Sequence, residues 1–203
     1  MIEPNPLIYF ARHGETDWNR DGRIQGQIDI PMNDAGHLQA KAVARGIKHH
    51  LGNAKIDRLV SSPLLRTRQT ASYLCRELDF PESRIEIAPA VIELSFGVWE
   101  GRYFRELKTS AGYPRDLLGH FHWRPKDGES YEDGLERINQ WIGRLDGPTV
   151  IVSHGAIGRC LIGLVSSLAP EDIVSLRTPQ GSFCRLENGQ IQWIDADGDA
   201  GEL

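Results

Sequence analysis

Short apolar runs alternate with segments of helical periodicity along most of this chain. The runs 7–10 and 56–61 are each followed by apolar residues spaced three, four or seven apart, at Ala40, Val43, Ile47 and Leu51 and at Leu64, Ala71, Leu74 and Leu78. Such spacing lines up one apolar face along a helix. The repeated strand–helix order predicts an α/β fold, a three-layer sandwich with a mainly parallel central sheet.

The residues before these helical segments predict where the helices begin. Asn33 is a candidate N-cap for the first helix. For the second, Ser62 is the candidate N-cap and Pro63 the first helical residue, a position that tolerates proline because its N–H would be unpaired anyway.

The second half of the chain continues the pattern. The run 149–153 is apolar throughout, which is typical of a buried parallel strand. Two helices flank it, one marked by Leu135, Ile138, Trp141, Ile142 and Leu145 and ended by Gly147-Pro148, the other marked by Ile157, Leu161, Leu164 and Leu168. Residues 85–87 and 91–94 form short strands or extended loop. Asn188-Gly189 between 182–186 and 190–194 predicts a type I′ hairpin at an antiparallel edge.

Composition limits the classes of protein that this chain can belong to. Its 203 residues are 40% hydrophobic, which suits one domain over 1–195. Its net charge of -5 disfavours nucleic acid or an acidic membrane as a binding partner. Arg159 interrupts the longest apolar stretch, so no membrane span is expected. The N-terminus lacks the pattern of a secretory signal, which favours the cytoplasm. A monomer and a homodimer both remain open, and the acidic tail 196–203 is expected to be disordered.

The cysteines and paired histidines do not form recognisable metal sites. Cys75, Cys160 and Cys184 are widely spaced, as expected for reduced thiols in a core. The pairs His49-His50 and His120-x-His122 lack carboxylate or cysteine partners at ligand spacing, so no metal site is predicted.

Residues that can bind an anion or take part in catalysis follow the predicted strands. Arg12 and His13 come after the first run, Arg66 shortly after the second, and His154 directly after the buried strand, while Glu93 lies on a segment between them. Ligands of open α/β sheets bind beyond the carboxyl ends of the strands, so these side chains are expected to converge.

Together these residue types suit phosphoryl transfer. Arginine presents a planar fork that fits phosphate oxygens, and two arginines would hold a dianion. A neutral imidazole can attack phosphorus, and nearby arginines keep it unprotonated. A carboxylic acid beside the phosphate could then donate a proton to the leaving alkoxide.

The same residues lie within motifs that resemble the histidine phosphatase superfamily, the phosphoglycerate mutase-like family. The matching segments occur in family order over about residues 7–195: Arg12-His13-Gly14-Glu15-Thr16-Asp17-Trp18-Asn19, Arg23-Ile24-Gln25-Gly26, Ser61-Ser62-Pro63-Leu64-Leu65-Arg66, Glu93-Leu94-Ser95-Phe96-Gly97, Gly128-Glu129-Ser130 and Ser153-His154-Gly155. A single Arg-His-Gly would be weak evidence, whereas this ordered series is specific.

The resemblance implies a role for each residue. His13 would be the phosphorylated nucleophile and Glu93 the proton donor, with Glu100 as the alternative acid. Arg12, Arg66 and His154 would complete the catalytic phosphate pocket, and the implied substrate-binding residues are Thr16, Asn19, Gln25, Gly26 and Gly155. Asn19 and Gln25 could instead simply cap turns of a long loop. Neither a metal nor an organic cofactor is implied.

Three functions remain open at this point. The short stretch 102–134 favours a compact phosphatase of a small phosphorylated metabolite, because family mutases are typically longer here. The alternatives are a cofactor-dependent phosphoglycerate mutase and a module that binds a phospho-ligand without turnover. The complete set of histidines, arginines and acid disfavours the last.

The segment 102–128 could influence the choice of substrate. Between 102 and 126 it carries six cations and two acids, and it also contains the aromatic residues Tyr103, Phe104, Tyr113, Phe121 and Trp123. The cations could form a solvated face, or part of the segment could cover the pocket like a lid and favour substrates with a second anionic group. The aromatic side chains could pack this segment onto the domain or contact an apolar substrate.

Overall fold

A six-stranded sheet forms the centre of the molecule, for which a computed structural model describes residues 7–196. The strand order is β3-β2-β4-β1-β5-β6. β1 to β4 run parallel, and β5 and β6 add an antiparallel edge beside β1. The strand bounds are β1 Ile8–Arg12, β2 Arg58–Ser61, β3 Glu86–Ile87, β4 Thr149–Ser153, β5 Ser182–Glu187 and β6 Gln190–Asp195.

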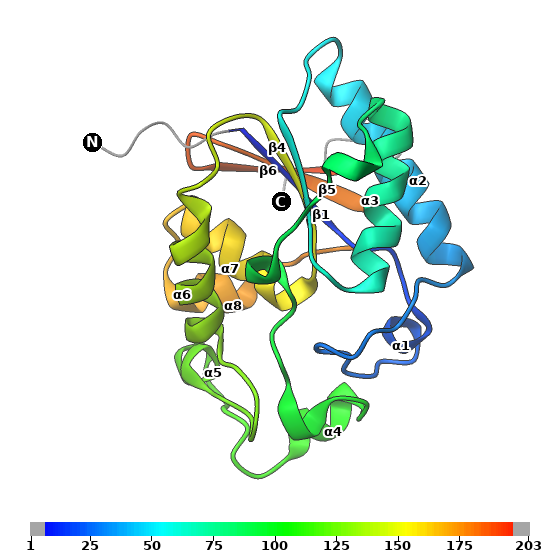
Figure 1. Cartoon of the computed structure of the whole chain (residues 1–203). Helices are drawn as coiled ribbons and strands as arrows, with labels where there is room; N and C mark the ends of the chain where they lie inside the picture. The colour runs from blue at the N-terminus through cyan, green and yellow to red at the C-terminus, as the bar shows by residue number, and fades with distance from the viewer. Residues whose placement is uncertain (1–6, 197–203) are drawn as a thin grey trace.

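Helices cover both faces of this sheet, which confirms the predicted three-layer α/β sandwich (Figure 1). One face carries α2 (Asp34–Leu51) and α3 (Leu65–Leu78), and the other carries α6 (Tyr131–Ile142) and α7 (Gly155–Val165), with α8 (Pro170–Ser175) against α7. Shorter helices lie in the connections: α1 Asp17–Arg20, α4 Phe104–Thr109 and α5 Leu117–His122, with 3₁₀ turns at Glu82–Arg84, Pro89–Val91 and Gly97–Trp99. Among residues 7–196, no helix is both long and apolar enough to cross a membrane.

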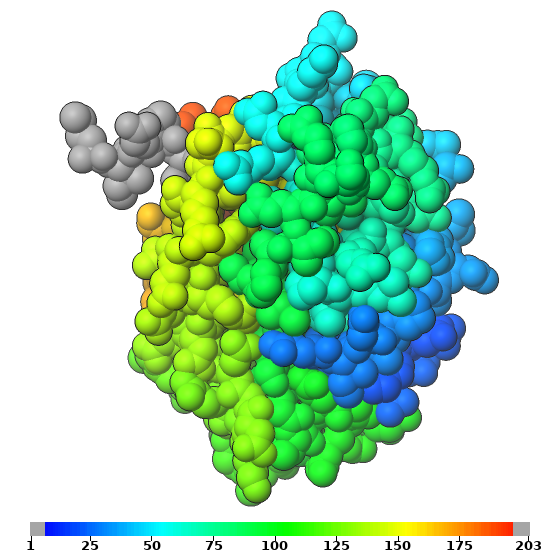
Figure 2. All heavy atoms as spheres, in the orientation of Figure 1, coloured from blue at the N-terminus to red at the C-terminus, as the bar shows by residue number. Residues whose placement is uncertain are grey.

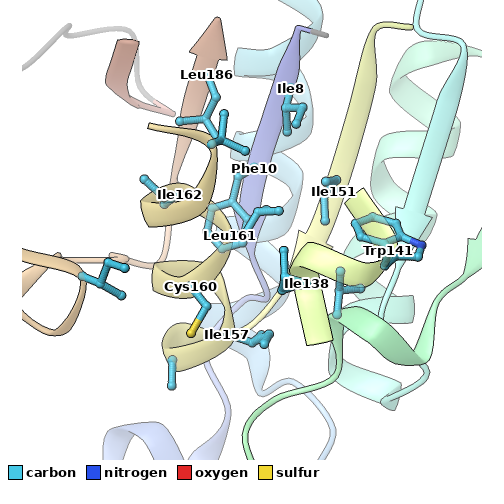
Figure 3. Packing of buried hydrophobic residues seen from close by; sticks show 14 of the residues in the cluster. Ile8, Phe10, Ile138, Trp141, Ile151, Ile157, Cys160, Leu161, Ile162 and Leu186 are labelled. Atoms are coloured by element: carbon cyan, nitrogen blue, oxygen red, sulfur yellow. The ribbon is translucent and has the colours of Figure 1, made fainter. Parts of the chain in front are cut away.

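Each face of the sheet has its own hydrophobic core. Because side chains alternate along a strand, Phe10 of β1 packs with α6 and α7, whereas Tyr9 packs toward α2 and α3. Figure 3 shows members of the first core, among them Phe10, Ile151 of β4, and Ile157 and Leu161 of α7. All five residues of β4 are buried, as predicted for a central parallel strand. The three cysteines are free and buried, which confirms the prediction of core thiols.

The first residues of the predicted helices agree in one case and differ in the other. Asn33 caps α2 by accepting a hydrogen bond from Gly36 N at 2.9 Å, as predicted. The prediction that Ser62 caps α3 is wrong, since that helix begins at Leu65 and its N-cap residue, Leu64, makes no side-chain cap. The hydroxyl of Ser62 is instead engaged with His154, with Nε2 and Oγ 2.7 Å apart.

Helix α6 ends before the predicted stop at Gly147-Pro148. It ends at Ile142 with Gly143 as C-cap, and a tighter turn follows in which Leu145 N donates to Ile142 O at 3.0 Å. Leu145 is nevertheless buried in the core. The apolar spacing therefore predicted which residues are buried, but it did not mark where the helix ends.

Helix α7 likewise ends at Val165, before Leu168, which the apolar spacing had included. Leu168 N donates to Gly163 O at 2.9 Å and Ser167 N to Leu164 O at 3.3 Å, with Ser167 in the left-handed region at φ 54°. This is the Schellman arrangement, in which the second residue beyond the helix makes an apolar contact. Leu168 packs against the core in that role.

The connection between β5 and β6 agrees with its prediction, and residues 91–94 take one of the two conformations that were expected. Asn188 and Gly189 have φ values of 52° and 77° between β5 and β6, as a type I′ hairpin requires. Residues 91–94 form no strand and continue from a 3₁₀ turn as loop. Ala196 N donates to Gly181 O at 3.2 Å, and the rest of the predicted tail, 197–203, lies outside the described residues.

Two chain segments that are far apart in sequence pair beside the carboxyl ends of the parallel strands. Ile24 N donates to Arg102 O and Gly101 N to Ile24 O, each at 2.8 Å, and Phe104 N donates to Gly22 O. Figure 2 shows the resulting contact between the blue N-terminal segment and the green segment around α4. This pairing holds the start of the segment 102–128 over the loop that follows β1.

The tight contact between Gly158 of α7 and Phe10 of β1 generates a stability prediction. A Cβ on Gly158 would lie 2.3 Å from Cζ of Phe10, so Gly158→Ala must displace the helix or the ring. Despite the higher helix propensity of alanine, we expect a loss of about 1–2 kcal/mol in the free energy of unfolding. Denaturant unfolding measures it, with Gly143→Ala as control because a Cβ there meets nothing within 4 Å. Equal stabilities of the two variants would contradict the prediction.

Candidate active site

Three parallel strands, β1, β2 and β4, end at the same level, so the candidate catalytic residues that follow them lie at one edge of the sheet. Arg12 is opposite Ser153 in the pairing of β1 with β4, and Ser61 is opposite Val152 in the pairing of β2 with β4. The residues that follow these strand ends are therefore close in space. His13 N donates to Ser153 O at 3.0 Å, which holds the chain after β1 against the end of β4.

A pocket of about 320 Å³ lies at this edge. It brings together four of the five predicted catalytic residues, Arg12, His13, Arg66 and Glu93. The other described residues that line it are Asn19, Gly22, Arg23, Ile24, Gln25, Gly26, Phe96 and Phe104.

His13 is held in one orientation and one tautomer. It is 2% exposed, and its Nδ1 lies 2.8 Å from Gly14 O. A carbonyl can only accept, so Nδ1 carries the hydrogen and Nε2 of the neutral ring keeps its lone pair. Burial, followed by the charges of Arg66 and Arg12, lowers the pKa of His13 well below its ordinary value. The imidazole is therefore neutral at physiological pH and can act as a nucleophile.

His154 lies beside His13, with ring centroids 5.2 Å apart. Arg66 Nε donates to His154 Nδ1 at 3.3 Å, so Nε2 carries the hydrogen and donates to Ser62 Oγ. Burial is the largest cause that lowers the pKa of His154 well below the ordinary value, and Arg66 is the next. His154 is not among the described residues that line the pocket. It lies beside His13 and in contact with Arg66.

Arg66 is an almost fully buried cation, at 1% exposure. Its Nη1 and Nη2 donate to the carbonyls of Ile28 and Gly26, each at 2.8 Å. Burial lowers the pKa of Arg66 to about 10, which leaves it protonated at neutral pH.

Arg12 supplies the second positive charge. Its Nη1 donates to Thr178 O at 3.0 Å, whereas its buried Nε has no hydrogen-bond partner. Buried polar groups are normally paired, so an unpaired N–H on an arginine that lines a pocket is suited to an anion.

The two candidate acids have different surroundings. Glu93 lines the pocket, where its carboxylate accepts hydrogen bonds from Ala156 N at 3.1 Å and Ile157 N at 2.9 Å in the first turn of α7. Glu100 is outside the pocket lining, and its Oε1 accepts from Gln27 N and Phe96 N. The geometry therefore favours Glu93 over Glu100 as the group that meets a bound ligand.

The implied substrate-binding residues divide into two groups. Asn19, Gln25 and Gly26 line the pocket, and the Gly26 carbonyl also orients Arg66. Thr16 is buried as the N-cap of α1, and Gly155 lies against Arg12, where an added Cβ would be 3.4 Å from Cζ. The last two are placed to support the pocket walls and are not among the described residues that line the pocket.

Four pocket residues were not predicted: Gly22, Arg23, Ile24 and Phe96. A fifth, Phe104, is one of the aromatic residues for which substrate contact was an alternative to packing. Arg23, Ile24 and Phe96 lie inside the motif segments, and this was the only sequence signal that could have identified them. That they line the pocket is decided by how the loops fold. Arg23 stacks over Trp18 at 4.2 Å and donates from Nε to Gly101 O at 2.9 Å. Its terminal nitrogens have no protein partner among residues 7–196.

The segment 102–128 contributes an aromatic side chain to the pocket and none of its six cations. Arg102, Arg105 and Lys108 instead lie over aromatic rings, and Arg124 pairs with Asp133. Most of its aromatic residues pack within the fold, because Phe121 is buried and the rings of Tyr113 and Trp123 are in contact, with centroids 5.2 Å apart. Phe104 is 38% exposed at the pocket mouth.

The paired histidines take part in ordinary contacts. His120 Nε2 lies 3.2 Å from the hydroxyl of Tyr113, and His122 Nδ1 lies 3.0 Å from a carboxylate oxygen of Glu132. Within residues 7–196, no three His, Cys, Asp or Glu side chains gather as a metal-holding group.

Known proteins resemble this chain along almost its whole length. Probable phosphoglycerate mutases GpmB from Escherichia fergusonii and Cronobacter sakazakii are 34% and 32% identical to it, over 92% of this chain and 87% of theirs. Among solved structures, a mycobacterial glucosyl-3-phosphoglycerate phosphatase is 25% identical with a TM-score of 0.76, covering 93% of this chain and 95% of that one. The alpha-ribazole phosphatase from Shigella flexneri is 25% identical with a TM-score of 0.74, covering 97% of this chain and 95% of that one.

The family model of the histidine phosphatase superfamily (branch 1) matches residues 8–194. This span includes every residue of the pocket and all of the described strands except the last residue of β6. The chain therefore belongs to the histidine phosphatase superfamily.

Proposed function

We propose that this chain is a phosphatase that hydrolyses a small phosphorylated metabolite through a phosphohistidine on His13. Its superfamily contains phosphatases and mutases. The observation that carries the proposal is the pocket in which a neutral His13, two arginines and Glu93 face one space. Nucleophile, charge stabilisation and acid are the three components that this reaction needs.

In the first step, His13 Nε2 attacks the phosphorus of the ester. The new N–P bond forms as the bond from phosphorus to the leaving oxygen breaks, and protonated Glu93 gives its proton to that oxygen. Arg12 and Arg66 stabilise the charge on the transferring oxygens. The hydrogen bond from His13 Nδ1 to Gly14 O holds the ring so that Nε2 is the attacking atom.

In the second step, water attacks the phosphorus and the N–P bond breaks. Glu93 takes a proton from this water, and inorganic phosphate leaves. The acid and the histidine are thereby restored, as a full catalytic cycle requires.

The relatives named as probable phosphoglycerate mutases make a mutase the second candidate function. In a mutase, the alcohol of a phosphoglycerate would replace water in the second step. The short stretch 102–134 and the likeness to two solved proteins that are named as phosphatases favour hydrolysis.

Removal of the proposed nucleophile tests the mechanism. We expect His13→Ala to lose phosphate release from phosphomonoesters by at least about a thousandfold, since no other group can form the intermediate. Phosphate release in EDTA measures it, with His49→Ala as a control because His49 is exposed. Quenched wild-type enzyme should contain acid-labile, alkali-stable phosphate.

Three results would contradict this proposal. Phosphate release by His13→Ala would exclude His13 as the nucleophile. Wild-type enzyme that releases no phosphate, but interconverts 3- and 2-phosphoglycerate with a bisphosphate primer, would identify a mutase. Silence in both assays would leave a phospho-ligand binding module.

The role of Glu93 has its own signature. Glu93→Gln cannot protonate a leaving group, so alkyl phosphates should slow by about 100-fold or more, whereas p-nitrophenyl phosphate should slow far less. Steady-state kinetics on both substrates measure the difference, with Glu100→Gln in parallel. If Glu100→Gln shows this leaving-group dependence instead, Glu100 is the acid.

A second anionic group on the substrate would meet Arg23, because this cation lines the pocket and those of 102–128 do not. We expect Arg23→Met to lower the preference for 3-phosphoglycerate over glycerol phosphate by about threefold at low salt, a modest effect because the group is partly exposed. Arg102→Met is the matched control and should leave the preference unchanged. The reverse ranking of the two variants would assign the selectivity to the segment 102–128.

A further inference from the structure

A side chain outside every motif quoted above contacts the candidate site from the far end of the chain. Gln180 lies in the short connection between α8 and β5. Its Nε2 donates to Asn19 Oδ1 at 3.0 Å and to His13 O at 3.1 Å. Both partners belong to the loop that follows β1.

The hydrogen bonds around Asn19 determine which end of its amide faces the pocket. Its Oδ1 accepts from Thr16 N at 3.2 Å, from Thr16 Oγ1 at 3.1 Å and from Gln180 Nε2. A backbone N–H can only donate, so the atom that it meets must be the oxygen. The oxygen of Asn19 is therefore fully engaged on the protein side.

The orientation of Gln180 follows by the same reasoning. Its two contacts are a backbone carbonyl and the Asn19 oxygen, which both accept. Only an NH₂ group can serve two acceptors, so the nitrogen end of Gln180 faces this loop.

Asn19 Nδ2 is left with two N–H groups that have no protein partner among the described residues. Asn19 lines the pocket together with Arg12, His13 and Arg66. An amide NH₂ at that position can donate to a phosphate oxygen, whereas the amide oxygen would repel one.

The chain around Gln180 is itself held against the site. Thr178 is 4% exposed and its carbonyl accepts from Arg12 Nη1 at 3.0 Å. Two residues of one short connection thus orient two pocket residues, one cationic and one neutral.

We infer that Gln180 is a positioning residue, which fixes the amide of Asn19 so that its NH₂ group faces the phosphoryl group of the substrate. This inference rests on the proposed function for the identity of the ligand. Gln180 acts through Asn19 and does not itself line the pocket.

The test compares substitutions that remove the donor. Gln180→Met keeps the length of the side chain, and Gln180→Glu keeps its shape but has an oxygen where the NH₂ group was. We expect the affinity for inorganic phosphate, measured by titration calorimetry, to fall by about fivefold to thirtyfold in Gln180→Met. It should fall further in Gln180→Glu. Gln140→Met, on the exposed side of α6, is the matched control and should bind phosphate as the wild type does.

A double-mutant cycle separates positioning from a general structural role. If Gln180 acts through Asn19, Asn19→Ala with Gln180→Met should bind phosphate no more weakly than Asn19→Ala alone. The same non-additivity should appear in the KM for p-nitrophenyl phosphate, with a smaller effect on kcat. Thermal unfolding of each variant shows whether the fold is retained.

Several outcomes would overturn the inference. Additive losses would show that Gln180 acts independently of Asn19, and wild-type affinity in Gln180→Glu or Gln180→Met would show that the donor is not needed. Because the phosphate titration requires no turnover, its result is separate from the proposed function. Wild-type protein that binds phosphate without hydrolysing esters would refute the function and leave the inference standing.

Discussion

The candidate site depends most on the hydrogen bonds that the buried guanidinium of Arg66 donates. It is a cation at 1% exposure, and its donors join α3 to two other parts of the chain: the loop that holds the carbonyls of Gly26 and Ile28, and the ring of His154. A buried charge is costly unless it is hydrogen-bonded, so the loop after β1 must fold back over α3 to supply those carbonyls. After burial, this charge is the next largest cause that lowers the pKa of both His13 and His154.

The parallel sheet explains why so few residues suffice to build this pocket. β1 and β4 end level with each other, so His13 and His154 come within ring contact although they are far apart in sequence. α7 starts at the end of β4, and its first free N–H groups hold Glu93. Strand register and a helix N-terminus together position His13, His154 and Glu93.

Sequence reasoning was most reliable where local chemistry determines structure. The Asn188-Gly189 hairpin, the Asn33 cap and the buried strand β4 follow from residue type and spacing. It was least reliable at helix ends. Leu168 and Leu145 kept the apolar spacing after their helices had ended, because burial can continue through a Schellman turn or a tight turn.

The sequence by itself determined the superfamily, the α/β class and the identity of the residues at the strand ends, since these depend on motifs and periodicity that are local in the chain. Only the tertiary structure decided which atoms face the ligand. The tautomers of His13 and His154, the amide orientation of Asn19 and the engagement of Glu100 each depend on hydrogen-bond partners that are distant in sequence or set by loop geometry. The place of Gln180 beside Asn19 and the absence of the cations of 102–128 from the pocket lining have the same origin. Contacts between such distant segments exist only in the packed chain, so no local pattern encodes them.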